Sequence, residues 1–275
     1  DYLSGWGEML AYTWTNNVPP SRPSINELCL YRKYLDKIRE TKQKPIRILI
    51  LGSTPEFRDW GFEENLDITV VDKSKDYYNV ISRELRHKNI KETLIVSRWE
   101  DMEFTEEFDL IVGDLSVGNI EKERVDDFIN AIYNALAPGG YFLGKSFFWT
   151  ENDVVLTPKQ IVMNFYHNKQ VHPYTFINHQ LGLYCLDRER FEIDFSSMYQ
   201  EMVKLKEDGD INEEIFSYFD NVGWNTDMKF TFFAPTRYFF ESKIKKKLIF
   251  IGYIDSLEIY SNIFPVYVAM KEDIK

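Results

Sequence analysis

A glycine and an aspartate, each at the end of an apolar run, are the residues of this sequence whose spacing points most directly to chemistry. Residues 47–52 (RILILG) and 67–72 (DITVVD) both have the pattern of a strand buried on two faces, and Asp72 follows Gly52 by 20 residues. A glycine where a strand turns into a helix leaves backbone N–H groups open to polar or anionic ligand atoms. An acid at the end of the next strand can accept hydrogen bonds from both hydroxyls of a ribose. The pair therefore predicts a nucleoside site.

The turn itself, residues 52–56 (GSTPE), narrows the choice of nucleoside. Ser53 or Thr54 can cap the following helix, and Pro55 suits its first turn. Only one glycine of the G-x-G-x-x-G fingerprint stands here, so the turn lacks the usual grip on a diphosphate. This favours an adenosyl ligand without a diphosphate. Gly52 alone would also fit a plain tight turn.

Proton transfer has several candidate bases in this chain: Asp114, His167, His172, His179 and the tyrosines of residues 151–235. His167, His172 and His179 are separated by five and seven residues, which matches no standard helical pair of metal ligands, so no metal site is expected. Each histidine also fits a polar surface or pocket position. The sequence does not choose among the candidate bases.

The elements that position these residues alternate between short apolar strands and helices. Further strands are predicted over residues 93–96 (TLIV), 108–114 (FDLIVGD) and 141–148 (YFLGKSFF). Helices are predicted over 76–88 and over 125–136, the second stopped by Pro138-Gly139-Gly140. Alternation of this kind favours a parallel sheet covered by helices on both faces, an α/β fold.

Four regions follow from this pattern. Residues 1–45 are expected to form a helical lead-in, broken at 18–24 (VPPSRPS), where Ser24 and Glu27 have the spacing of a capping box. Residues 46–150 form the nucleoside-binding core. The chain loses the strand–helix alternation over residues 151–235, an aromatic-rich and largely helical insertion, with helices expected from Thr157-Pro158 and over 190–208. Residues 236–275 should complete the sheet, with a helix over 236–251 and antiparallel strands over 256–262 and 264–271.

The insertion and the proline segment have each two interpretations. The insertion's aromatic residues can form a small core of their own, a substrate cap over the carboxyl ends of the strands, or both. An aromatic pocket suits a small acceptor that is partly apolar or cationic. The proline segment is either a connector or a flap that crosses the ligand, with Arg22 near a ligand carboxylate.

Composition excludes several classes of protein. Lys plus Arg is 33 and Asp plus Glu is 44, which gives a net charge of −11 and argues against nucleic-acid binding. The basic run at 243–247 (KIKKK) is therefore assigned to a solvated helix face. Two cysteines cannot form a disulfide framework, and neither a membrane span nor a signal peptide is expected. A cytoplasmic location follows as an expectation, with a homodimer left open.

Taken in order, these strand-end motifs resemble class I S-adenosylmethionine-dependent methyltransferases. The resemblance rests on Gly52, on Asp72, on the segment Trp99 to Asp101, on FDLIVGD ending at Asp114 and on LAPGGYFLGK at 136–145. It covers residues 46–150 and 236–271, and the segments 18–24 and 51–56 (LGSTPE) also resemble a poorly characterised bacterial and archaeal subgroup. The family's fold is a Rossmann-like, mostly parallel seven-stranded sheet that ends in a C-terminal antiparallel hairpin.

The resemblance implies a cofactor, S-adenosylmethionine, with S-adenosylhomocysteine as product, and a small-molecule acceptor. It also implies a role for each matching residue: Gly52, Ser53, Thr54, Pro55 and Glu56 around the methionine part, Asp72 on the ribose, Lys73 against the adenine, Arg98, Trp99 and Asp101 near the adenine ring and its amino group, and Asp114 and Leu115 beside the sulfonium. Thr54 and Glu56 replace two glycines of the family pattern, and Arg98 replaces an acid. Two other interpretations stay open: a nicotinamide-dependent oxidoreductase, which shares Gly52 and Asp72, and a non-catalytic member that acts through protein contacts.

Overall fold

A seven-stranded sheet forms the centre of the protein in the computed structural model, which describes Trp14 and residues 17–42, 45–167, 172–221, 224–227 and 229–273. Its strand order is β3-β2-β1-β4-β5-β10-β9. The neighbours from β3 to β5 pair in parallel, whereas β10 is antiparallel to both β5 and β9. The expected α/β fold with a C-terminal antiparallel hairpin is thus confirmed. The strands are β1 (Arg47–Leu51), β2 (Asp67–Asp72), β3 (Glu92–Val96), β4 (Phe108–Asp114), β5 (Leu136–Lys145), β9 (Ile249–Ile254) and β10 (Val266–Met270).

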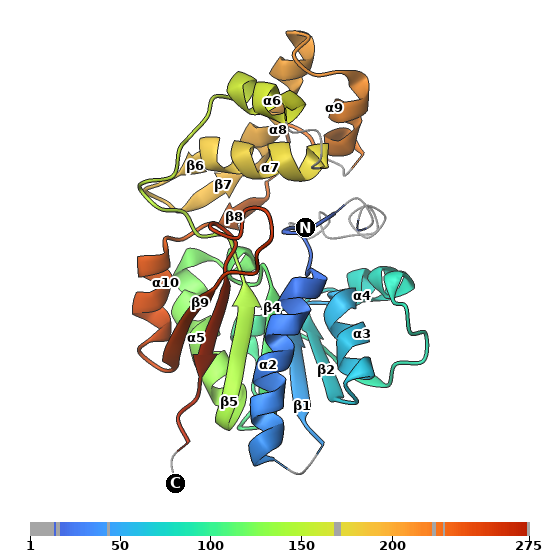
Figure 1. Ribbon diagram of the computed structural model, residues 1–275, viewed down its shortest axis with the longest axis vertical. Coiled ribbons are helices and arrows are strands. Elements are labelled where there is room, and N and C mark those ends of the chain that lie inside the picture. Colours follow the sequence, from blue (N-terminus) through green and yellow to red (C-terminus); the bar gives the residue numbers. More distant parts are fainter. Residues whose placement is uncertain are drawn as a thin grey trace.

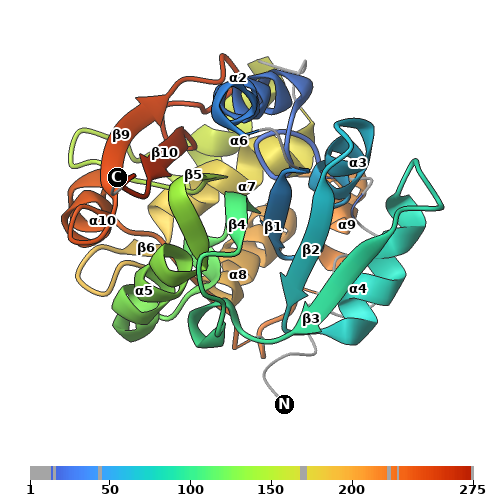
Figure 2. The same cartoon turned by 90° about the horizontal axis from the view of Figure 1, so that it is seen from below.

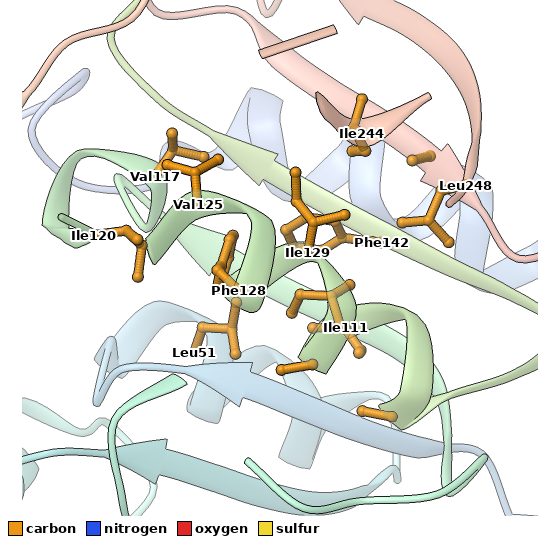
Figure 3. Close-up of a cluster of buried hydrophobic side chains, with 14 of the residues drawn as sticks. Leu51, Ile111, Val117, Ile120, Val125, Phe128, Ile129, Phe142, Ile244 and Leu248 are labelled. Carbon is orange, nitrogen blue, oxygen red and sulfur yellow. The ribbon is translucent and has the colours of Figure 1, made fainter. Parts of the chain in front are cut away.

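Helices cover both faces of this sheet, as Figure 2 shows from below. On one face, α2 (Ile25–Thr41) and α3 (Pro55–Glu63) bury aromatic and aliphatic side chains against the strands. On the other face lie α5 (Val125–Ala135) and α10 (Arg237–Ile244), while α4 (Lys75–Ile81) lies near the β3 edge. In Figure 3, Phe128 and Ile129 of α5 pack towards Leu51, Ile111 and Phe142 of the strands. This packing holds the carboxyl ends of β1, β2 and β4 side by side.

A second layer lies above the carboxyl ends of the strands (Figure 1). We call it the roof; it is formed by residues 151–235 and has an apolar core of its own. It contains a small antiparallel sheet as well as helices. The sequence does not predict this sheet, because its strands are too short to show an alternating pattern of side chains. Its elements are α6 (Pro158–His167), α7 (Pro173–Tyr184), β6 (Leu186–Asp187), β7 (Glu192–Asp194), α8 (Phe195–Glu207), α9 (Glu213–Asp220) and β8 (Thr231–Phe233).

Several predicted boundaries were wrong. The helix expected over 236–251 ends at Ile244, and residues 249–254 form the edge strand β9, because they pair with β10. Residues 256–262, expected to be a strand, form turns instead. The segment 190–208 divides into the strand β7 and the helix α8. At β9 and at β7, strand pairing in the folded protein has overridden the local preference for helix.

Two further elements differ in length from expectation. Strand β5 begins at Leu136, includes Pro138 and both glycines, and ends at Lys145 rather than at residue 148. Helix α4 and the 3₁₀ turn after it end at Glu84, short of the predicted residue 88. Asp59 accepts hydrogen bonds from the backbone N–H groups of Arg86 and His87, which gives these groups partners outside a helix.

The lead-in contains the predicted capping box. Ser24 Oγ accepts a hydrogen bond from Glu27 N at 3.1 Å, and Glu27 Oε2 accepts one from Ser24 N at 2.9 Å. The part of the expected lead-in before Trp14 lies outside the described residues. None of the helices in the described ranges is both long enough and apolar enough to span a bilayer.

Candidate active site

A cavity of about 240 Å³ lies between the carboxyl ends of the strands and the roof. Strand-end residues form its floor, and residues of α7, β7, α8 and the strand β8 form its upper wall. Ligands of open α/β sheets bind at this end of the strands. The cavity is therefore lined by residues of both layers.

The first polar group of the floor is the turn after β1. Gly52 has φ of +84°, and its N–H donates to Val71 O at 2.8 Å. A Cβ at this position would lie 3.3 Å from the ring of Trp99, so the backbone approaches the indole closely. Glycine permits both the left-handed backbone and the close approach. The cavity therefore begins with bare backbone.

Asp72 faces the cavity from the end of β2 and is 6% exposed. Its Oδ2 accepts a hydrogen bond from Ser53 Oγ at 2.5 Å, and its Oδ1 accepts one from Ser74 N at 2.9 Å. Burial raises the pKa of Asp72, while these two hydrogen bonds act against the rise. The Ser53 backbone acts in the same direction, so only part of the carboxylate's capacity of about four acceptor sites stays available for a ligand.

The segment after β3 forms one side wall. Trp99 Nε1 donates to Val71 O at 2.8 Å, which fixes the indole beside the Gly52 turn. Glu100 is buried, lines the cavity and accepts from Arg98 Nε at 2.8 Å. Asp101 is exposed and pairs with Arg124 at 2.7 Å outside the cavity. The acid that lines this wall is thus Glu100, one residue before the expected one.

Beneath the floor, two carboxylates share one ammonium. Lys145 Nζ lies 2.9 Å from Glu27 Oε2 and 3.2 Å from Asp114 Oδ1, and the three side chains are at most 5% exposed. Burial, as the largest influence, raises the pKa of Asp114 to about 7, although Lys145 acts in the opposite direction. Asp114 lines the cavity, so a carboxyl that can gain or lose a proton near neutral pH faces the ligand space.

The roof presents aromatic rings to the same cavity. Phe195 lies between Trp224 and Phe230, with ring centroids 4.9 Å apart on both sides in edge-to-face geometry. Tyr174 packs against Trp224 at 6.1 Å. The lining residues on this side and its flanks are Leu115, Asn119, Phe147, Tyr174, Asn178, His179, Gly182, Ile193, Phe195, Met198, Trp224, Phe230, Phe232 and Phe264.

Residues 17–24 form a strap between the two layers. Ser21 Oγ and His179 Nε2 are 3.3 Å apart, which joins the strap to the roof. Arg22 Nε donates to Glu56 Oε1 at 2.6 Å, which joins it to the first turn of α3, and Lys145 Nζ donates to Arg22 O at 3.1 Å. Asn17 and Ser21 line the cavity. The strap thus contacts the floor, the roof and the buried ion cluster.

The structure brings most of the sequence-predicted site residues to one cavity. Gly52, Ser53, Thr54, Asp72, Lys73, Arg98, Trp99, Asp114, Leu115 and His179 line it. Pro55, Glu56, Asp101 and His167 do not; His167 is exposed and its ring contacts Met163 O at 2.6 Å.

The sequence did not indicate Lys145 or Glu100 as site residues, and it indicated only a helix-capping role for Glu27. Lys145 ends an apolar strand, which is an unusual place for a lysine and was the available signal.

Comparisons with known proteins rest on structure. No protein-family model matches the sequence, and no curated protein matches it. A methyltransferase from Clostridium acetobutylicum that depends on S-adenosylmethionine superposes with a TM-score of 0.57, at 13% identity, over 96% of this chain and 98% of its own. One from Methanosarcina mazei gives 0.51, at 13% identity, over 86% and 97%. A protein from Rhodobacter sphaeroides described as a putative Zn-dependent alcohol dehydrogenase gives 0.59, at 11% identity, over 98% of both chains.

The strand order separates these fold types. The doubly wound dehydrogenase sheet is parallel in the order 3-2-1-4-5-6. Here a reversed strand, β10, lies between β5 and the edge strand β9. The chain has the fold of class I S-adenosylmethionine-dependent methyltransferases. In this methyltransferase fold the described cavity lies over β1, β2 and β4, where the sequence resemblance expects the cofactor.

Proposed function

We propose that the protein transfers a methyl group from S-adenosylmethionine to a small-molecule acceptor. One observation carries the proposal: the same cavity is lined by polar strand-end residues and by an aromatic roof, so a cofactor and an acceptor could meet in it. The floor has hydrogen-bonding groups for a nucleoside, and the roof has apolar surface for an acceptor. The methyltransferase fold supports this assignment of the two halves.

The residues of the floor fit an adenosyl cofactor. Asp72 would accept from the ribose with the acceptor capacity that Ser53 and Ser74 leave on its two oxygens. Trp99 offers an indole beside the Gly52 turn. Lys73 and Arg98 would lie along the adenine side, and the bare backbone from Gly52 to Thr54 would follow the methionine part. Asp72, Glu100 and Asp114 give this floor three acids for a cationic ligand.

The chemistry needs positioning more than activation. When bound, S-adenosylmethionine supplies a methyl group already activated on a sulfonium. The chain's own part is to align the acceptor and limit its contact with water, to which the roof and the strap contribute by covering part of the cavity. Asp114 would take the acceptor's proton, since its pKa of about 7 suits proton transfer near neutral pH. His179 is less suited as a base, because burial lowers its pKa to about 3.

Calorimetry with the purified chain tests the cofactor. We expect S-adenosylhomocysteine to bind with a micromolar dissociation constant and S-adenosylmethionine to bind in the same cavity. The absence of any binding heat at millimolar ligand would contradict the proposal. Mass-spectrometric detection of methylated product from a panel of acceptors then separates an enzyme from a non-catalytic binding protein.

A nicotinamide-dependent oxidoreductase is the second candidate, because it would use the same Gly52 turn and Asp72. The first turn of α3 argues against a diphosphate there. Pro55 has no N–H to donate, and Glu56 places a negative charge in that turn. Titration with a reduced nicotinamide dinucleotide, followed by its fluorescence, distinguishes the two: binding tighter than that of S-adenosylhomocysteine would favour the oxidoreductase.

A further inference from the structure

The charges that line the cavity are divided unequally between its two halves. All charged lining residues belong to the floor: Asp72, Lys73, Arg98, Glu100 and Asp114. Among the described residues, the lining from Leu115 to Phe264 contains no Asp, Glu, Lys or Arg. A charged group placed against the roof would lose its hydration without gaining an ionic partner. The roof therefore selects against an anion, and it offers a cation no partner beyond contact with its aromatic rings.

His179 does not change this balance. It is 6% exposed and packs against Phe264, with ring centroids 4.5 Å apart. Burial and the nearby Lys145 lower its pKa to about 3, so the imidazole is neutral at physiological pH. Its Nε2 contacts Ser21 Oγ at 3.3 Å, and the ring offers no positive charge. The amide of Asn178, one residue earlier in α7, offers a hydrogen bond to a ligand.

Two cations at the floor are committed to carboxylates, and the remaining one, Lys73, directly follows β2, on the side where the adenine of the proposed cofactor would lie. Lys145 is held between Glu27 and Asp114. Arg98 donates to Glu100 at 2.8 Å and to Glu121 at 2.9 Å. An acceptor with a carboxylate or a phosphate would have to compete with these carboxylates. An acceptor that is already cationic would lie close to the sulfonium of the cofactor, and like charges repel in a buried site.

The shape of the roof adds a second requirement. Rings of Tyr174, Phe195, Trp224 and Phe230 meet edge to face at centroid distances of 4.9 to 6.1 Å. Aromatic groups pack favourably against such arrangements in offset or edge-on geometry. Asn178 and His179 are the neutral polar groups of α7 on the same wall. These features together suit a flat, apolar molecule with one polar substituent.

We infer that the methyl acceptor is an uncharged, planar aromatic compound that carries a hydroxyl or amino group. The inference rests on the proposed methyl transfer. The acceptor's oxygen or nitrogen forms a bond to the methyl carbon as the methyl–sulfur bond breaks, and that bond's electron pair stays on sulfur. The acceptor's proton passes to the carboxylate of Asp114. The products are a methyl ether or methylamine and neutral S-adenosylhomocysteine.

Three matched probes test the acceptor class: 2-naphthol, 6-hydroxy-2-naphthoate and 6-(aminomethyl)-2-naphthol. They share a naphthalene ring and a hydroxyl. They differ at carbon 6, which carries hydrogen, a negative carboxylate or a positive aminomethyl group. Binding to the full chain is measured by quenching of tryptophan fluorescence, with and without S-adenosylhomocysteine. We expect 2-naphthol to bind about tenfold more tightly, or better, than both charged probes. Equal or tighter binding of a charged probe overturns the inference, as does the absence of 2-naphthol binding at its solubility limit.

A charge placed in the roof supplies the complementary test. Asn178→Arg puts a cation on the wall that has none, and should reverse the preference between 2-naphthol and 6-hydroxy-2-naphthoate. Asn178→Gln is the matched control and should keep the wild-type order. An Asn178→Arg variant that folds and still prefers 2-naphthol would contradict the inference. If the wild type does not bind S-adenosylhomocysteine, the proposed function fails. The probes still test the roof in that case, because their binding is also measured without S-adenosylhomocysteine.

Discussion

The ammonium of Lys145 lies 3.2 Å from a carboxylate oxygen of Asp114, and both side chains are at most 5% exposed. Glu27, 118 residues away from Lys145 in the chain, is the second carboxylate on the same ammonium, at 2.9 Å. The cluster joins the end of β5, the end of β4 and the first turn of α2. One lysine thus ties the sheet to the strap beneath the candidate active site.

Loss of that lysine should destabilise the fold strongly. Lys145→Met leaves two buried carboxylates without their cation, which is expected to cost about 3–5 kcal/mol of unfolding free energy. The variant's deficit should be smaller at pH 5 than at pH 8, because protonation relieves a carboxylate that has no partner. Urea denaturation of both proteins at the two pH values measures it.

Lys159→Met is the control for this substitution. Lys159 pairs with Asp210 at 3.0 Å, but its side chain is 66% exposed. An exposed pair contributes roughly 0–1 kcal/mol, so this variant should be close to wild type. Equal losses in the two lysine variants would show that the buried cluster is not special.

The pKa of Asp114 predicts a specific dependence of stability on pH. Burial raises this pKa from its ordinary value of 3.8 to about 7, so the folded state keeps a proton that the unfolded state has released. The contribution of Asp114 to stability is therefore largest below about pH 4 and is lost as the pH rises to about 7. Asp114→Asn should gain stability relative to wild type across that window. A difference between the two proteins that stays constant from pH 4 to pH 8 would contradict the assignment.

Asp72 should matter to cofactor binding and little to folding. Asp72→Ala removes hydrogen bonds to a charged group, which should weaken S-adenosylhomocysteine binding by about 1.5–3 kcal/mol, or roughly 10- to 150-fold. The variant leaves Ser53 Oγ and Ser74 N without their acceptor, but it also removes a carboxylate whose pKa is raised by burial, so the melting temperature should fall only modestly. Asp67→Ala, at the exposed opposite end of β2, is the control and should bind like wild type. Unchanged affinity in Asp72→Ala would mean that the acid has another role.

The sheet was predictable because its central strands are continuous apolar runs. β1, β2 and β4 are buried along most of their length and need no alternating pattern to be seen. The edge strand β9 was mistaken for helix, since its pattern becomes clear only when it pairs with β10. The strand predicted over residues 256–262 is wrong for the same reason, because local propensity does not report the pairing partner.

The site was predictable only where strand ends define it. Gly52, Asp72 and Asp114 follow apolar runs, so their neighbourhood follows from the topology of a parallel sheet. The choice between Glu100 and Asp101 depends on which side of a 3₁₀ turn faces inward, and the sequence does not specify that. Glu27 was recognised as a capping residue, but its contact with Lys145 depends on how α2 docks on the sheet.

The strap offers a test of how the cofactor is retained. Arg22 joins it to Glu56, so Arg22→Gln should loosen the strap and speed the dissociation of S-adenosylhomocysteine by about 3- to 10-fold. Stopped-flow displacement measures the rate. Arg32→Gln is the control, because it removes the same charge from an arginine that pairs with Glu64 on the outer side of α2 and α3. Equal rates for both variants would contradict a retaining role for the strap.

The contact between Gly118 and Phe232 allows the roof half of the cavity to be changed while the floor half is left as it is. A Cβ at residue 118 would lie 1.8 Å from the Phe232 ring, so Gly118→Ala must displace a ring that lines the cavity. We expect 2-naphthol binding to weaken by about tenfold or more while S-adenosylhomocysteine binding stays within about twofold, since no floor residue is touched. Calorimetry with both ligands gives the comparison. If Gly118→Ala weakens both ligands equally, the two halves of the cavity do not bind separate molecules.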